Sequence, residues 1–239
     1  MSGGVALNSA CNGKLRKKAP FEKIWIQPAA SDAGCSLGAT KYLYHQVLGN
    51  ERDYVMNDVF LGPGYTDEEI KEVLDREGAD YEKLSYEKLI DKTASLLKND
   101  KVVSWYQGRL EWGPRALGNR SILANPRKQE NMDRINQKVK HREEFRPFAP
   151  SVLEDEAENY FDISYESPYM LFVFKVLEEK RDEIPAVTHV NGTARIRTVN
   201  REQNKKYYDL IEKFGQKTGT PCCTEHFLQR QRRAYSQHS

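Results

Sequence analysis

Apolar residues recur at helical spacing in two stretches near the middle of the chain. Thr66-Asp-Glu-Glu69 has the form of a capping box and precedes Ile70, Val73 and Leu74, so the pattern predicts a helix that ends near Gly78. Ser85 to Lys98 carries leucine and isoleucine at similar spacing and predicts a second amphipathic helix.

Later segments alternate between strand and helix patterns. Lys101–Tyr106 predicts a strand that leads into a glycine-rich loop, and residues 131–140 predict a helix. Tyr169–Lys175 is aromatic and β-branched and has the strongest strand pattern in the chain. A final helix is expected from about Asn204 to Thr218, with aromatic residues on one face.

The first 50 residues also indicate a mixed α/β arrangement. Gly3-Gly4 precedes a predicted helix that ends near Gly13, and Lys23–Gln27 predicts a short strand. A further helix is expected from Gly34 to Leu48. Residues 51–64 are polar and end in Gly-Pro-Gly, which is typical of a linker. We therefore expect an α/β (α+β) protein with domains at 1–50 and 65–221.

Composition restricts the function classes. The chain has 239 residues, 38% hydrophobic and 30% charged, with a net charge of +2. That charge is too small to indicate nucleic-acid binding, and no apolar stretch approaches the roughly 20 residues of a membrane span. We find no signal-peptide pattern and expect a cytoplasmic protein. Cys11 and Cys35 are expected to be buried free thiols, and Cys222-Cys223 has no metal-site spacing.

The segment from Gly108 to Pro126 carries the clearest chemical signal. It places arginines among glycines and a proline, directly after the predicted strand. Guanidinium groups match phosphate or carboxylate oxygens in pairs, and glycine lets the backbone approach a ligand. A second basic cluster follows at residues 138–146. Together they predict a site for a polyanionic small molecule.

These segments resemble a known enzyme family. GRLEWGPRALGNRSILANP, followed by INQKVKHREEFRPFAPSV, is similar to the C-terminal half of the O-carbamoyltransferases, which include the nodulation-factor, tobramycin and cephamycin enzymes. The pieces GGVALN, PAASDAG and THVNGTAR agree in order. The resemblance runs from residue 3 to about residue 221.

The resemblance implies a fold and a reaction. Residues 1–50 would be a remnant of an actin/hexokinase-like domain, and 65–221 a YrdC-like domain with a twisted mixed sheet and flanking helices. In this family, carbamoyl phosphate and ATP give carbamoyl-adenylate, and a metal such as iron or magnesium assists transfer to a hydroxyl of a sugar or natural product. The partners would be carbamoyl phosphate, ATP and a hydroxylated acceptor. We expect neither nucleic acid nor membrane, and a homodimer is our oligomeric hypothesis.

Candidate site residues follow from the same motifs. The catalytic candidates are Arg109, Arg115 and Arg146. Asp32 matches a family metal ligand, with a helix N-cap as the alternative. His189 is expected to line the pocket, and Asn191 departs from the usual Asp. Glu111 is expected to orient Arg109 or Arg115 by an ion pair, with a general-base role as the alternative. The substrate-binding and nucleotide-binding candidates are Gly3, Gly4, Asn119, Ser121, Lys138, Lys140, Arg142, Ser151, Thr188 and Arg195.

Both ends depart from the family pattern. The chain begins inside the family's Gly-Gly-Val-Ala-Leu-Asn element, so we expect the metal-binding histidines and the complete transfer reaction to be missing. Codons that we chose among the allowed ones for residues 222–238, read from the second base, give Ala-Val-Leu-Asn-Thr-Ser-Phe-Asn-Val-Arg-Gly-Glu-Pro-Ile-Val-Asn, which contains a family motif. We therefore expect Cys222–Ser239 to be a frameshifted, poorly ordered tail; a lineage-specific tail is the alternative.

Two other function classes stay open at this point. YrdC-like folds also bind double-stranded RNA or nucleotides, and the chain could equally be a non-functional gene fragment. The Trp-Gly-Pro-Arg signature favours the carbamoyltransferases over an RNA-binding module, as does the low net charge.

Overall fold

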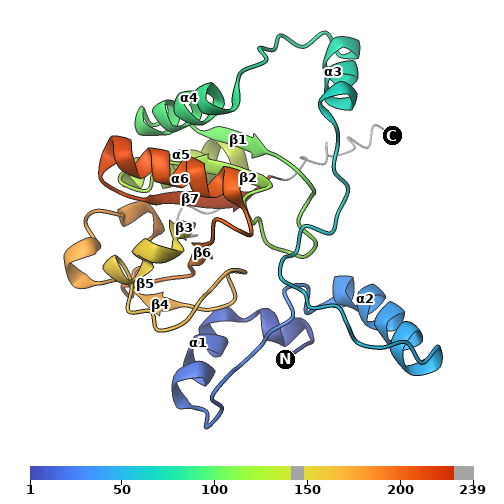
Figure 1. Ribbon diagram of the computed structural model, residues 1–239. Coiled ribbons are helices and arrows are strands. Elements are labelled where there is room, and N and C mark those ends of the chain that lie inside the picture. Colours follow the sequence, from blue (N-terminus) through green and yellow to red (C-terminus); the bar gives the residue numbers. More distant parts are fainter. Residues whose placement is uncertain (141–147, 229–239) are drawn as a thin grey trace, which may run out of the picture.

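The computed structural model describes residues 1–140 and 148–228. At its centre is a mixed five-stranded sheet with the order β1-β2-β7-β3-β6 (Figure 1). Only the β3–β6 pairing is parallel; the other neighbours are antiparallel. The expected α+β class is therefore confirmed. The strands are β1 (Val103–Tyr106), β2 (Arg120–Ala124), β3 (Ala149–Leu153), β6 (Arg197–Val199) and β7 (Cys222–Phe227).

Helices α4 (Tyr86–Lys98) and α6 (Lys205–Thr218) cover one face of the sheet (Figure 1). Ser85 and Asn204 cap their N-termini through side-chain oxygens. Both helices were predicted from the sequence, because their apolar faces follow the helical period. Buried side chains between the helices and the sheet include Ile90, Leu97, Leu123, Ile211, Phe214 and Cys223.

The opposite face packs against the two segments that lie between β2 and β3 and between β3 and β6. Successive residues of a strand point to opposite faces of the sheet. Leu123 and Cys223 therefore pack with the side chains of α4 and α6, whereas Ala124 and Cys222 belong to a separate hydrophobic core on the opposite face. The elements here are α5 (Gln129–Arg134), the π turn η3 (Ile135–Lys140), 3₁₀ turns η4 (Glu154–Asn159), η5 (Glu178–Lys180) and η6 (Pro185–Val187), and the hairpin β4 (Phe174–Lys175) with β5 (Thr193–Ala194).

Two strand predictions are wrong in extent. Tyr169–Lys175 forms a strand only at Phe174–Lys175, because Met170 adopts a positive φ of 55° and Leu171 uses its carbonyl for a side-chain bond. Lys23–Gln27 has no regular secondary structure among the described residues. Aromatic and β-branched residues favour a strand in both segments. Among the described residues, however, no strand pairs with Lys23–Gln27, where Trp25 is exposed, or with residues 169–173.

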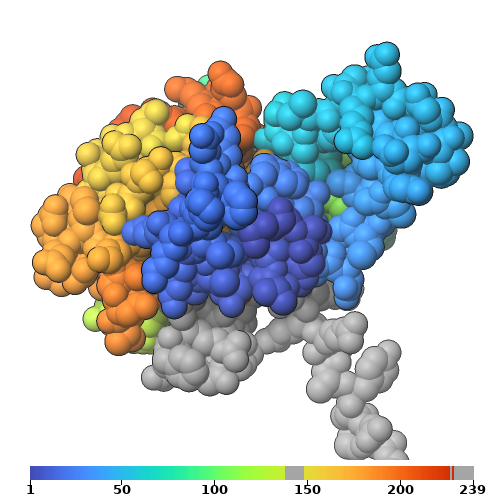
Figure 2. Space-filling model, turned by 90° about the horizontal axis from the view of Figure 1, so that it is seen from below, coloured from blue at the N-terminus to red at the C-terminus, as the bar shows by residue number. Residues whose placement is uncertain are grey.

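The N-terminal block docks through α1. It comprises η1 (Gly4–Leu7), α1 (Ser9–Lys18), α2 (Asp32–Tyr42) and the π turn η2 (Leu43–Val47). Helix α1 continues past Gly13, contrary to our prediction, and uses this glycine for contact: a Cβ there would lie 2.7 Å from the Val173 carbonyl oxygen. Asn12 Nδ2 donates to the carbonyls of Ala6 and Leu171 at 2.8 and 3.0 Å. Figure 2 shows this block covering part of the C-terminal region.

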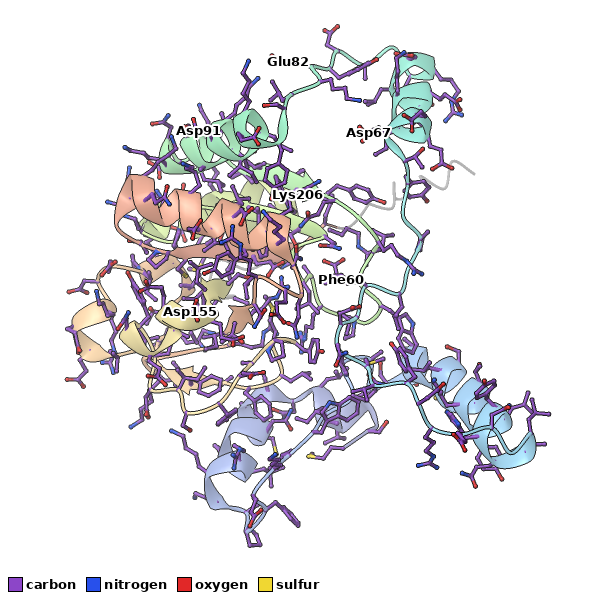
Figure 3. All side chains as sticks on the ribbon, viewed as in Figure 1. Phe60, Asp67, Glu82, Asp91, Asp155 and Lys206 are labelled. Atoms are coloured by element: carbon purple, nitrogen blue, oxygen red, sulfur yellow. The ribbon has the colours of Figure 1, made fainter. Side chains whose placement is uncertain are left out.

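Helix α3 (Asp67–Arg76) stands apart from the sheet. Its predicted capping box is confirmed, since Thr66 Oγ1 accepts from Glu69 N and the Glu69 carboxylate accepts from Thr66 N. Asp67 and Glu82 lie on this outer arm, away from the sheet (Figure 3). No helix in the described ranges is long and apolar enough to cross a membrane.

The segment from Cys222 requires a correction. We expected Cys222–Ser239 to be poorly ordered, yet Cys222–Phe227 forms β7, the central strand of the sheet, which pairs with both β2 and β3. Cys222 and Cys223 are completely buried, while Cys11 and Cys35, which we expected to be buried, are exposed. Local sequence did not reveal β7 because its burial is set by strands distant in sequence. Its origin in a shifted reading frame stays a prediction, and residues 229–239 lie outside the described residues.

Candidate active site

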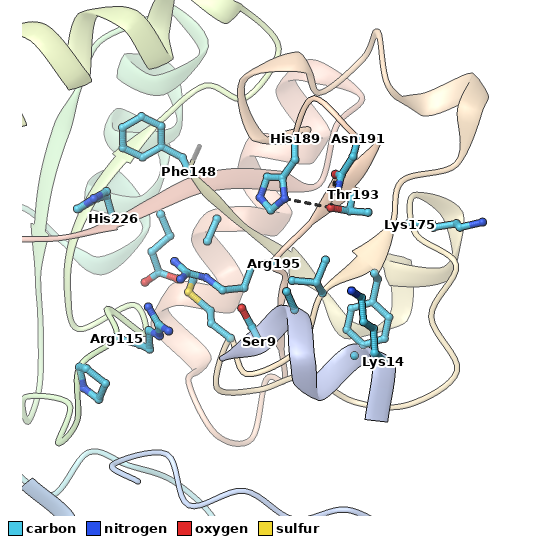
Figure 4. A pocket seen from close by; sticks show the side chains of 18 of the residues that line it. Ser9, Lys14, Arg115, Phe148, Lys175, His189, Asn191, Thr193, Arg195 and His226 are labelled. Carbon is cyan, nitrogen blue, oxygen red and sulfur yellow. Dashed lines mark hydrogen bonds between the residues drawn. The ribbon is translucent and has the colours of Figure 1, made fainter. Parts of the chain in front are cut away.

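A pocket of about 710 Å³ opens where α1 meets the C-terminal region (Figure 4). Its walls come from α1, the loop at Pro114–Ala116, the start of β3, the segment 170–175, and the turn before β5. Positive side chains dominate the charged groups of its lining, and Glu225 is the carboxylate among them. The cationic lining residues are Lys14, Lys17, Lys18, Arg115, Lys175 and Arg195. The pocket therefore suits an anion.

Arg115 is the charged residue that the loop at Pro114–Ala116 contributes to the pocket lining. Its Nη2 donates to the Leu7 carbonyl at 3.2 Å, which connects the loop to the N-terminal block. Its Nε is buried without a hydrogen-bond partner, and no carboxylate of the described residues forms an ion pair with it. Burial lowers the pKa of Arg115, although a guanidinium stays protonated in proteins. An incompletely paired cation at a pocket is a binding group for an anion.

Glu111 organises the loop that carries Arg115. One carboxylate oxygen, Oε1, accepts from the backbone N–H groups of Leu117, Asn119 and Arg120 at 2.8, 2.7 and 3.0 Å. Glu111 is 4% exposed. The expected ion pair with Arg109 or Arg115 is therefore wrong; the carboxylate holds backbone instead, as anions do at clustered amides. Its contacts give no support to a general-base role.

Arg109 lies elsewhere. Its Nε and Nη2 donate to the carbonyls of Gly62 and Leu61, both at 2.9 Å, and its side chain is exposed. It borders a separate depression with Pro63, Tyr65 and Thr66. The structure thus separates the two arginines of the loop: Arg115 faces the pocket, and Arg109 ties the preceding segment to the loop.

Several predicted binding residues belong to a buried hydrogen-bond network. Asn119 Nδ2 donates to the Arg109 carbonyl at 2.7 Å, and its Oδ1 accepts from Asn204 at 2.9 Å. Ser121 Oγ donates to Glu225 Oε1 at 2.6 Å, and Ser151 Oγ donates to Glu225 Oε2. Asn119, Ser121 and Ser151 therefore form hydrogen bonds with buried polar groups and do not line the pocket.

The centre of that network is an ion pair that sequence reasoning missed. Arg197 Nη1 lies 3.5 Å from Glu225 Oε2, and the two side chains are 5% and 0% exposed. Burial raises the pKa of Glu225, and Arg197 opposes this. No local pattern marks either residue, because the pair joins β6 to β7 through the fold.

The turn before β5 places His189 at the pocket, and Thr193 at the start of β5 and Arg195 directly after β5 also line it. His189 Nδ1 lies 3.0 Å from Thr193 Oγ1, and that hydroxyl donates to Asn191 Oδ1 at 2.7 Å. Burial, together with the nearby Arg195 charge, lowers the pKa of His189. Both Arg195 and His189 were expected at the site from the sequence, and both line the pocket.

The other described candidates, Thr188, Gly3 and Gly4, do not line the pocket. Thr188 donates to the Ile184 carbonyl at 2.9 Å, and Gly3 N donates to the Ala30 carbonyl at 2.6 Å, so the Gly3-Gly4 turn is tied to the N-terminal block. Of the second basic cluster, Arg142 and Arg146 lie outside the described residues, as do the side chains of Lys138 and Lys140.

Asp32, the one metal ligand that the resemblance implies for this chain, does not lie in a metal-binding cluster of the described residues. Asp32 is exposed in the first turn of α2. Across residues 1–140 and 148–228, no group of three or more His, Cys, Asp or Glu side chains could hold a metal ion. We therefore derive no chemical step through a metal, and the role of Asp32 stays a prediction.

Comparison with protein families now identifies the class. Residues 94–230 match the carbamoyltransferase C-terminus model, and residues 1–41 match the carbamoyltransferase N-terminus model. The chain belongs to the carbamoyltransferase family. The pocket lies between the two matched regions, since α1 falls in the first and Arg115, His189 and Arg195 in the second.

Relatives of this chain include nodulation proteins. It is 44% identical over 225 residues to nodulation protein NolNO of Sinorhizobium fredii, covering 92% of this chain and 33% of the relative. It is 43% identical over 225 residues to nodulation protein NolO of Bradyrhizobium diazoefficiens, covering 92% and 41%. Nodulation protein U of Rhizobium fredii is 34% identical over 223 residues, covering 92% and 36%. The chain thus spans about two fifths or less of these relatives.

Proposed function

We propose that this chain supplies the carbamoyl phosphate and ATP site of an ATP-dependent O-carbamoyltransferase. The observation that carries the proposal is Arg115, whose guanidinium borders the pocket without a carboxylate partner among the described residues. Arg195 lies across the same pocket. Two guanidinium groups on one cavity favour a phosphate ligand, since each presents a planar set of donors.

The distribution of charge supports two anionic substrates. Arg115 and Arg195 are half-buried, and we assign them the phosphate of carbamoyl phosphate. Lys14, Lys18 and Lys175 lie on the exposed rim, where they would attract the triphosphate of ATP. In the overall reaction, carbamoyl phosphate, ATP and water give carbamoyl-adenylate, pyrophosphate and phosphate. Fixed cations stabilise the negative charge that develops on the departing phosphates.

The second half of the proposal concerns transfer. Carbamoyl-adenylate would pass its carbamoyl group to a hydroxyl of a sugar or natural product and release AMP. The pocket borders α1, in the region that matches the N-terminal family model, so an intermediate formed there would lie beside that region. We assign no acceptor-binding residue in this chain.

Calorimetric titration with carbamoyl phosphate and with ATP tests the proposal. We expect saturable binding of each that weakens as salt rises, because both ligands are held by charge. A parallel gel shift with double-stranded RNA should show no complex at physiological salt. If the chain bound RNA but bound neither carbamoyl phosphate nor ATP, the result would contradict the proposal and favour a nucleic-acid-binding module.

A further inference from the structure

The hydrogen bonds around His189 fix the positions of two protons. The Asn191 Oδ1 atom can only accept, so the Thr193 hydroxyl uses its single proton in the 2.7 Å bond to Asn191. In the 3.0 Å contact with His189 Nδ1, the Thr193 oxygen must therefore accept. It follows that Nδ1 carries the ring proton.

The other ring nitrogen is then a hydrogen-bond acceptor at the pocket. Burial and the Arg195 charge lower the pKa of His189, so the ring is neutral near pH 7 and Nε2 holds a lone pair. No protein group in the described parts of the chain bonds to Nε2. His189 lines the same cavity as Arg115 and Arg195, and the ring lies beside Arg195 in Figure 4.

An acceptor among cations is informative about the ligand. A cavity that bound only a phosphate group would present donors, because phosphate oxygens are acceptors. Of the small acyl phosphates, carbamoyl phosphate carries an amino group with two N–H donors, whereas acetyl phosphate has a methyl group at that position. A neutral imidazole next to a pair of phosphate-binding arginines can accept a hydrogen bond from carbamoyl phosphate but not from acetyl phosphate.

We propose that His189 is the specificity-determining residue of the pocket, and that its Nε2 accepts a hydrogen bond from the amino group of carbamoyl phosphate. This inference rests on the proposed function. Thr193 and Asn191 are positioning residues that hold the Nδ1–H tautomer. Two backbone hydrogen bonds hold the turn that carries these residues. His189 N donates to the Thr193 carbonyl at 2.7 Å, and Gly192 N donates to the His189 carbonyl at 2.8 Å.

The test is the ratio of the dissociation constants for acetyl phosphate and carbamoyl phosphate, measured by calorimetry at pH 7.5. We expect the chain to prefer carbamoyl phosphate by about tenfold, the effect of one buried hydrogen bond. The ratio should approach one in His189→Leu, and it should be partly retained in His189→Gln, which offers an amide oxygen. Thr193→Val should lower the ratio while affinity for inorganic phosphate stays unchanged.

His45→Leu is the matched control. His45 is an exposed histidine on η2, where its Nδ1 lies 3.0 Å from the Asn50 carbonyl oxygen, and its substitution should leave the ratio unchanged. Should His189→Leu fail to fold, Thr193→Val gives the same readout. Equal affinities of the unmodified chain for the two acyl phosphates would overturn the role of His189 and leave the proposed function intact. Binding of neither acyl phosphate would overturn both.

Discussion

Arg197 and Glu225 form an ion pair inside the protein, with Nη1 of Arg197 3.5 Å from Oε2 of Glu225. The pair joins β6 to β7, which flank β3 on either side. Ser121 and Ser151 donate to the same carboxylate, and Tyr207 stacks against the arginine at 5.2 Å. A buried pair of this kind costs desolvation, which the surrounding donors offset in part.

The pair predicts a pH dependence of stability. Burial raises the pKa of Glu225 above the ordinary value of 4.5, so the folded chain holds a proton that the unfolded chain has released. The free energy of unfolding should therefore fall as the pH rises from 4.5 through the folded-state pKa. Urea unfolding across this range, compared between the unmodified chain and Glu225→Gln, isolates the contribution. Parallel pH profiles for the two proteins would show that Glu225 does not titrate in this way.

Loss of the Glu111 carboxylate should disrupt the arginine loop. Glu111→Ala leaves three backbone N–H groups without their acceptor, and we expect the free energy of unfolding to drop by about 3 kcal/mol. Binding of carbamoyl phosphate should weaken as well, because Arg115 lies on the same loop. Glu111→Gln keeps an acceptor oxygen, so its stability and its affinity for carbamoyl phosphate should fall less than those of Glu111→Ala. Urea unfolding and calorimetry measure both effects, and equal behaviour of the two variants would argue against this role.

Thiol labelling tests the position of β7. Cys11 and Cys35 are exposed, whereas Cys222 and Cys223 are buried in the sheet, and burial raises the pKa of both buried thiols. A thiol reacts as its thiolate, so the two exposed cysteines should react with Ellman's reagent in the native protein and the other two only after unfolding. The Cys11→Ser, Cys35→Ser double variant should be unreactive when folded. Rapid reaction of Cys222 or Cys223 would mean that β7 is not packed as described.

Local signals in the sequence predicted three of the helices well. The Thr66 capping box, the apolar face of 85–98 and the aromatic face of 204–218 each specify a helix through neighbouring residues alone. The strands were harder, because a strand depends on partners distant in sequence. Cys222–Phe227 has no distinctive pattern, yet β2 and β3 enclose it.

The residues of the candidate site also fall into two groups: those predicted from local motifs and those that depend on contacts between remote segments. Arg115, His189 and Arg195 were expected from motifs, and the fold brings them to one pocket. The lysines of α1 could not be predicted as neighbours, because the contact of Gly13 with Val173 that seats the helix joins two remote segments. Ser121 and Ser151 looked like ligand donors, but their partner is Glu225, which no local pattern connects to them.

The most direct test of the central claim compares the two arginines of one loop. Calorimetry with carbamoyl phosphate should show about 100-fold weaker binding for Arg115→Ala, since roughly 2–3 kcal/mol of charge-assisted hydrogen bonding is lost. Arg109→Ala should bind as the unmodified chain does, because Arg109 bonds only to backbone carbonyls outside the pocket. Thermal melts verify that both variants are folded. Unchanged affinity in a folded Arg115→Ala variant, or equal losses in both variants, would contradict the assignment of the pocket.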